Sequence, residues 1–169
     1  TGRYPHDNGD MGLTNEPLAW ELYSTEKHLA GVLRDAGYRT AAVGIVHETH
    51  KPVEHWGYEE CYGGSRAVSV ADNTIKLLKE RASDQQPFYI SAGTIEPHRI
   101  LGKGEHGYLG FVGDDIQPDT SKGVHVPGYL KDDEGTREEL AEIQGAVQHM
   151  DEQFGRVMKE LEKLGLRDN

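Results

Sequence analysis

The sequence predicts an α/β fold in which helices flank a parallel or mixed β-sheet. Three segments with helical periodicity alternate with two short, mostly apolar segments, in the order helix, strand, helix, strand, helix. Strands that are connected through helices usually run parallel. Because two strands are too few for a stable sheet, they are expected to belong to a larger one.

The first predicted helix follows a loop. Residues 1–23 are rich in glycine, asparagine and proline, which favours loop structure. A helix is expected over 25–36, with Ser24 or Thr25 as its cap and Gly37 as its stop. Its expected apolar stripe consists of Leu29, Val32, Leu33 and Ala36.

Two strands and a second helix come next. Residues 39–46 and 87–93 are mostly apolar and contain β-branched or aromatic side chains, which predicts buried strands. Between them, 47–68 is expected to form an aromatic-rich loop. A helix is expected over 69–82, with Ser69 as its N-cap.

A long irregular stretch precedes the last helix. Residues 94–135 include six glycines between Gly102 and Gly123, and such a long loop is usually functional or disordered. A capping box at 136–139 opens a long helix that ends at Gly165. Its expected inward residues are Leu140, Ile143, Val147, Met150, Phe154, Val157, Met158, Leu161 and Leu164.

Composition limits the class of protein. The 169 residues suffice for one domain, yet the hydrophobic content of 36% and the mean hydropathy of −0.69 are low for an independent domain. A piece of a larger fold would have this composition. The formal net charge of −11 argues against nucleic-acid or membrane partners, although a small anionic substrate remains compatible. The single cysteine, Cys61, excludes an internal disulfide.

Two histidines are candidates for catalysis. His47 directly follows the first predicted strand, and His98 lies just beyond the second. Ligands of open α/β sheets bind outside the carboxyl ends of the strands, so the two side chains can converge on one site. There an imidazole can donate to an anionic oxygen or protonate a leaving group. Alternatively, a loop-rich chain with nine histidines places some of them there by chance.

Glu96 and Arg99 flank His98 and are candidates for substrate binding. An arginine can clamp a sulfate or carboxylate with two hydrogen bonds, and a glutamate can accept bonds from sugar hydroxyls. The alternative for both is an ion pair within the protein. His50 and His55 lack the fixed spacing of metal ligands.

The remaining polar residues do not indicate a catalytic or metal-binding site. Cys61 has no cationic neighbour in the sequence that would activate it, so an incidental role is expected. A group of acidic residues lacks the spacing of a calcium loop and favours a solvated loop. These residues are Asp114, Asp115, Asp119, Asp132 and Asp133.

Six segments, taken in order, resemble the sulfatase family. Residues 1–13 (TGRYPHDNGDMGL) resemble the segment after the family's nucleophile, and 29–47 resemble the helix and strand that lead to its G-K-x-H motif. Residues 87–99 (PFYISAGTIEPHR) resemble its strand ending in x-P-H. The other segments are 56–60, 126–130 and 151–155. The Pro-His-Arg triplet and the loop after it are most similar to the heparan N-sulfatase (sulfamidase) branch.

The resemblance implies a fold, a reaction and two cofactors. The fold would be an alkaline-phosphatase-like α/β sandwich, and 1–169 would be part of a single catalytic domain. The reaction would be hydrolysis of a sulfate ester or sulfamate, on a sulfated sugar, by a formylglycine that precedes Thr1. Calcium would bind to ligands outside this chain, so the chain alone is expected to be inactive. Family members are periplasmic, secreted or lysosomal, and a cytoplasmic location also remains compatible.

The resemblance also implies roles for single residues. His47 matches the histidine near the nucleophile, a candidate base, and His98 matches the histidine that contacts the sulfate or the leaving group. Ile45 replaces the family lysine that neutralises sulfate charge, which would cost about 2–4 kcal/mol of transition-state stabilisation. Either Lys51 or Lys103 substitutes for it, the substrate differs, or the protein is weakened. Two rival functions follow: a phosphoesterase or phosphonate hydrolase of the same superfamily, and a non-catalytic protein that binds sulfated glycans.

Overall fold

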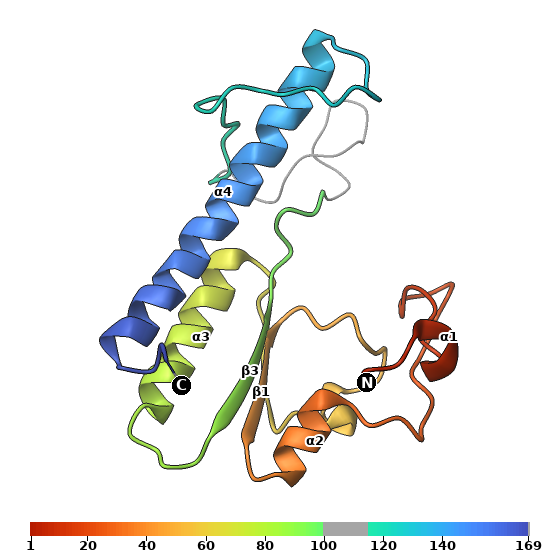
Figure 1. The fold of residues 1–169 in the computed structure, drawn as a ribbon, viewed down its shortest axis with the longest axis vertical. Helices are drawn as coiled ribbons and strands as arrows, with labels where there is room; N and C mark the ends of the chain where they lie inside the picture. Colours follow the sequence, from red (N-terminus) through yellow and green to blue (C-terminus); the bar gives the residue numbers. More distant parts are fainter. Residues whose placement is uncertain (100–114, 169) are drawn as a thin grey trace.

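The α/β prediction is confirmed by a computed structural model that describes residues 1–99 and 115–168. Three strands form one parallel sheet in the order β2-β1-β3 (Figure 1). The elements in chain order are α1 (Pro5–Asn8), α2 (Leu29–Asp35), β1 (Arg39–Gly44), the 3-10 helix η1 (Val53–Trp56), β2 (Glu60–Tyr62), α3 (Ala67–Arg81), β3 (Phe88–Gly93) and α4 (Glu134–Lys163).

The sheet has a separate apolar cluster on each face. Side chains alternate along β1, so Ala41 and Val43 pack with Val70 and Leu77 of α3 on one face. On the other face Ala42 packs with Ala30 of α2 and with Tyr58. Figure 1 accordingly shows α2 and α3 on opposite sides of the sheet, with α4 lying along α3.

The helix predicted over 25–36 is α2, which is shorter than predicted and buries a different face. His28 caps α2, because its Nδ1 accepts a hydrogen bond from the Ala30 backbone amide at 3.2 Å. Thus neither Ser24 nor Thr25 is the cap. Leu29 and Val32 are 50% and 46% exposed, whereas Ala30 is fully buried, so the predicted apolar stripe is wrong. The predicted stop is confirmed, since Gly37 follows α2 with a φ of 92°.

The two long helices begin earlier than predicted. Arg66, and not Ser69, is the N-cap residue of α3. The N-cap of α4 is Asp133, whose side chain accepts from the Thr136 amide at 3.0 Å. Gly165 follows the C-cap of α4 and is the stop that the sequence predicts, with a φ of 70°.

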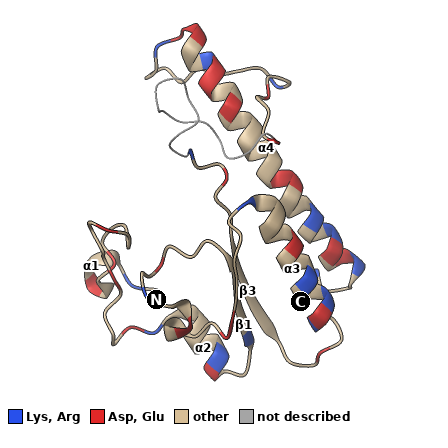
Figure 2. Ribbon diagram, turned by 180° about the vertical axis from the view of Figure 1, so that it is seen from behind, with Lys and Arg blue, Asp and Glu red and all other residues tan. Residues whose placement is uncertain are grey.

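The inward face of α4 is also different from the prediction. Its buried positions are the small residues Ala141, Gly145 and Ala146. Four residues expected to face inward are instead between 37% and 49% exposed: Ile143, Val147, Phe154 and Met158. In the ribbon of Figure 2, acidic residues predominate along the first half of α4, and residues of both signs lie near its end.

Some short elements are absent from the sequence prediction. The predicted 1–23 loop contains α1, and the predicted 47–68 loop contains η1 and β2. Within the described ranges, no helix has the length and apolar character needed to cross a membrane.

Candidate active site at the carboxyl edge of the sheet

Strands β1 and β3 end level with each other and in close contact. Gly44 pairs with Gly93 in the parallel register, and the Ile45 amide donates to the Gly93 carbonyl at 2.9 Å. A Cβ atom at Gly44 would lie 2.1 Å from the Gly93 carbonyl oxygen, and one at Gly93 would lie 2.2 Å from the Ile45 carbonyl oxygen. Only glycine therefore fits at these two positions. His47 and His98 follow the two strand ends, so both lie in exposed loops leaving the same edge of the sheet.

The loop after β3 fixes one nitrogen of His98. The His98 backbone amide donates to the Ile95 carbonyl at 2.7 Å, and its Nδ1 is hydrogen-bonded to the Arg99 carbonyl oxygen. Because a carbonyl oxygen only accepts, we assign the proton to Nδ1. In the neutral ring Nε2 then carries the lone pair and can take up a proton.

The Glu96 carboxylate points into the protein. Its side chain is 1% exposed, and its Oε1 accepts from Arg66 Nε at 2.6 Å. Its Oε2 accepts from the Ala67 backbone amide, the first of α3, at 2.8 Å. Arg99 Nη2 lies 3.1 Å from Glu139 Oε2 of α4. Both predicted substrate-binding residues thus form ion pairs within the chain, and their binding of substrate stays a prediction.

The N-terminal segment lies beside His47. Glu48, the next residue, accepts a hydrogen bond from His28 Nε2 at 2.8 Å. This bond lowers the pKa of Glu48 against the opposing effect of burial. Sequence reasoning missed His28 and Glu48, although Glu48 adjoins a predicted site residue.

Two more contacts tie the segments around this edge together. Glu21 Oε2 accepts from Thr49 Oγ1 at 2.8 Å and lies 3.0 Å from His50 Nδ1. Asp10 lies nearby: burial, followed by the charges of Glu21 and Glu48, raises its pKa. Yet within 1–99 and 115–168, no three His, Cys, Asp or Glu side chains are arranged to hold a metal ion.

Of the two candidates for replacing the family lysine, Lys51 lies within the described residues. Lys51 Nζ is 5.6 Å from the centre of the Trp56 ring, a cation–π contact. Lys103 and Asp114 lie outside the described residues. Burial and the nearby Glu54 raise the pKa of Cys61 to about 11, so this thiol is protonated and unreactive at neutral pH.

The acidic residues of the long loop have structural partners. Asp115 lies 2.6 Å from Arg66 Nη2 and 3.5 Å from His149 Nε2. Asp119 accepts from the Ser121 amide at 2.8 Å. These contacts fasten the loop to α3 and α4.

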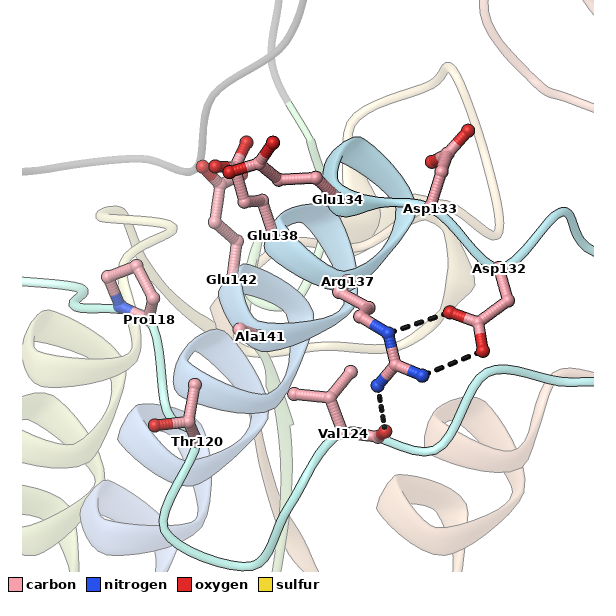
Figure 3. A pocket seen from close by; sticks show the side chains of 10 residues that line it. All are labelled: Pro118, Thr120, Val124, Asp132, Asp133, Glu134, Arg137, Glu138, Ala141 and Glu142. Carbon is pink, nitrogen blue, oxygen red and sulfur yellow. Dashed lines mark hydrogen bonds and ion pairs between the residues drawn. The ribbon is translucent and has the colours of Figure 1, made fainter.

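A cavity of about 880 Å³ lies elsewhere, between the segment around Thr120 and the first turns of α4. Figure 3 shows Glu134, Glu138 and Glu142 side by side along its wall. Its single basic side chain, Arg137, is held by both carboxylate oxygens of Asp132 at 2.7 Å. So negative a lining repels sulfate, and the cavity contains neither His47 nor His98.

Comparison with known proteins identifies the family. The chain is an α/β protein with two histidines at the carboxyl edge of a parallel sheet, and the Sulfatase family model matches residues 1–169. The chain belongs to the sulfatase family. It is 28% identical, over 186 aligned residues, to human N-sulphoglucosamine sulphohydrolase; the alignment covers 98% of this chain and 37% of that protein.

Solved structures show the same fold. The yidJ protein of Bacteroides fragilis, a proposed sulfatase, matches with a TM-score of 0.68 and 17% identity, over 100% of this chain and 48% of that one. Ps i-CgsB, solved in complex with k-i-k-neocarrahexaose, matches with a TM-score of 0.65 and 16% identity, over 100% and 44%. The fold is therefore alkaline-phosphatase-like, and the chain spans less than half of each of these proteins.

Proposed function

We propose that the full-length protein hydrolyses a sulfate ester or sulfamate of a sulfated sugar, with His47 and His98 as catalytic residues. The observation that carries this proposal is the position of both histidines at one edge of the parallel sheet, beside the segment that contains Glu21 and His28. Family membership and the likeness to N-sulphoglucosamine sulphohydrolase support it.

The two histidines have different tasks in this proposal. His98 takes up a proton at Nε2, because Nδ1 is engaged by the Arg99 carbonyl, and then donates this Nε2 proton to the leaving oxygen or nitrogen. His47 accepts a proton next to the nucleophile. The formylglycine implied by the resemblance would supply the nucleophilic oxygen from a position preceding Thr1. No step is assigned to calcium.

The substrate class follows from charge and from the relatives. Sulfate needs positively charged or hydrogen-bonding groups around its oxygens. Arg99 is the basic side chain next to His98, although it lies 3.1 Å from Glu139. The likeness to N-sulphoglucosamine sulphohydrolase favours a sulfamate, and the neocarrahexaose bound by Ps i-CgsB favours a saccharide.

Ile45 favours a second candidate function. An aliphatic side chain at the family's lysine position removes a positive charge from the site. A protein weakened in this way would bind sulfated glycans without hydrolysing them. Glycan binding without turnover, both in the wild type and in Ile45→Lys, would support this candidate.

The test uses the full-length gene product. Sulfate release is measured from N-sulfoglucosamine and from an aryl sulfate, with and without calcium, and phosphate release from a phosphate monoester is measured in parallel. We expect sulfate release, with the sulfamate preferred. Phosphate release in the absence of sulfate release would assign the protein to the phosphoesterases of the superfamily.

A further inference from the structure

We infer that Glu96 is a positioning residue for His98, and that it acts by tying the loop after β3 to the first turn of α3. This inference rests on the proposed function, because it gives the orientation of His98 a catalytic purpose. The Glu96 carboxylate ties the loop to α3 by accepting hydrogen bonds from Arg66 and from the Ala67 backbone amide.

The carboxylate is fully engaged and removed from solvent. Its Oε1 and Oε2 accept bonds of 2.6 Å from Arg66 Nε and 2.8 Å from the Ala67 amide, and the side chain is 1% exposed. The Ala67 amide belongs to the first turn of α3, where backbone amides have no partner within the helix. A glutamate from a distant segment thus takes the place of a capping side chain.

Arg66 extends the same connection to α4. Its Nη2 donates to Asp115 Oδ1 at 2.6 Å, and Asp115 Oδ2 lies 3.5 Å from His149 Nε2. The loop after β3, the start of α3 and the middle of α4 therefore meet at Arg66. Charged hydrogen bonds of this kind are about twice as strong as neutral ones, so the junction is stiff.

The connection from Glu96 to His98 is short. The Ile95 amide donates to the Ser65 carbonyl at 2.7 Å, and the His98 amide donates back to the Ile95 carbonyl at 2.7 Å. Between Glu96 and His98 stands only Pro97, whose ring fixes its φ. Movement of Glu96 is therefore transmitted directly to His98.

The same geometry disfavours contact between Glu96 and the substrate. Both oxygens already accept strong bonds, and a sulfated sugar would reach them only by opening the junction. A carboxylate would also repel the sulfate. Positioning agrees with these facts, whereas binding of sugar hydroxyls does not.

The experiment compares Glu96→Gln, Glu96→Asp and Arg66→Lys in the full-length protein, with Glu138→Gln on the exposed face of α4 as the matched control. For each variant, kcat, KM, the pH profile of kcat and the thermal midpoint are measured with N-sulfoglucosamine. An amide keeps one acceptor but turns an NH2 group towards a donor. We expect Glu96→Gln to lower kcat by roughly 100-fold, the scale of a 1 Å misplacement, while KM changes less than about twofold.

Three further results are expected. In Glu96→Gln, the limb of the pH profile of kcat that reports His98 shifts. The charge-preserving Glu96→Asp keeps more of the wild-type kcat than Glu96→Gln does. Arg66→Lys lowers kcat less than Glu96→Gln does. A rise in KM at constant kcat would overturn the inference in favour of substrate binding. A lower thermal midpoint with an unchanged pH profile would overturn it in favour of a merely structural role.

A second readout separates this inference from the proposed function. In 15N-labelled full-length protein, long-range ¹H–¹⁵N spectra report which ring nitrogen of His98 carries the proton. We expect the Nδ1–H form in the wild type and in Glu138→Gln, and a mixture in Glu96→Gln. An unchanged His98 spectrum in Glu96→Gln would overturn the inference whether or not the wild type releases sulfate, whereas failure of the wild type to release sulfate would count against the function alone.

Discussion

Gly44→Ala tests the close contact between β1 and β3 that positions the loops carrying His47 and His98. Gly44 has a φ of 82°, a conformation that costs a residue with a Cβ atom about 1–2 kcal/mol. In addition, the new Cβ would lie 2.1 Å from the Gly93 carbonyl oxygen and 2.6 Å from Val70 Cγ2. Overpacking of this kind costs about 1–3 kcal/mol more. We therefore expect a total loss of about 2–5 kcal/mol in the free energy of unfolding.

Gly37→Ala is the matched control. Gly37 has a similar φ of 92°, but its new Cβ would have no atom within 4 Å. It should lose only the conformational term, about 1–2 kcal/mol. The assay is equilibrium urea unfolding of the full-length protein, followed by sulfate release from the folded fraction. Equal losses in the two variants would refute the contact between the strand ends, and full activity in folded Gly44→Ala would refute its role in positioning.

Asp10→Asn should stabilise the protein at neutral pH, because burial and then the Glu21 charge raise the pKa of Asp10. The folded state resists ionisation of Asp10, so the gain in the free energy of unfolding is absent below the ordinary pKa of 3.8 and grows as the pH rises above it. The gain is measured by unfolding both proteins at pH 4 and at pH 7. An equal gain at the two pH values would contradict this reasoning. Glu60→Ala should lower the free energy of unfolding by about 3–5 kcal/mol, because it leaves the Arg81 side chain, which is 1% exposed and lies 2.6 Å from Glu60, without this partner. A loss below 1 kcal/mol in urea unfolding would contradict this. Ile45→Lys should raise kcat/KM for sulfate release by up to about 100-fold, and a decrease would show that a different cation already serves the site.

Local sequence patterns predicted β1 and β3 but not β2, and β1 is buried as predicted, whereas β3 lies at an edge of the described sheet and is only half-buried. The apolar runs of β1 and β3 predict buried strands because their side chains pack on both faces of a parallel sheet. The three-residue β2 has no such pattern. Its Glu60 is held by Arg39 and Arg81, contacts between segments that are far apart in the sequence.

Helix boundaries depended on tertiary contacts in the same way. His28 caps α2 while its other ring nitrogen binds Glu48, so the cap is fixed from outside the helix. In α4, periodicity shows which residues share a face but not which face meets the rest of the protein. Gly145 lies inward because the backbone of Gln117 approaches it so closely that a Cβ would clash with it.

The candidate site was predictable where it followed from strand ends. His47 and His98 were placed at one edge because parallel strands end together. The burial of Glu96 was not predictable, since its partner Arg66 lies in another segment and precedes a helix whose N-cap was expected at Ser69. The fold turns the Glu96 side chain inward, and its binding of substrate stays a prediction.

The most direct test of a shared site is sulfate release by His47→Gln, His98→Gln and the double variant of the full-length protein. His125→Gln is the control, because His125 is an exposed histidine in the loop before α4. If both histidines serve one reaction, each single variant loses at least about 100-fold in kcat, and the double variant loses far less than the product of the two. Wild-type rates in either single variant, with wild-type stability, would contradict the assignment of the active site to this edge of the sheet.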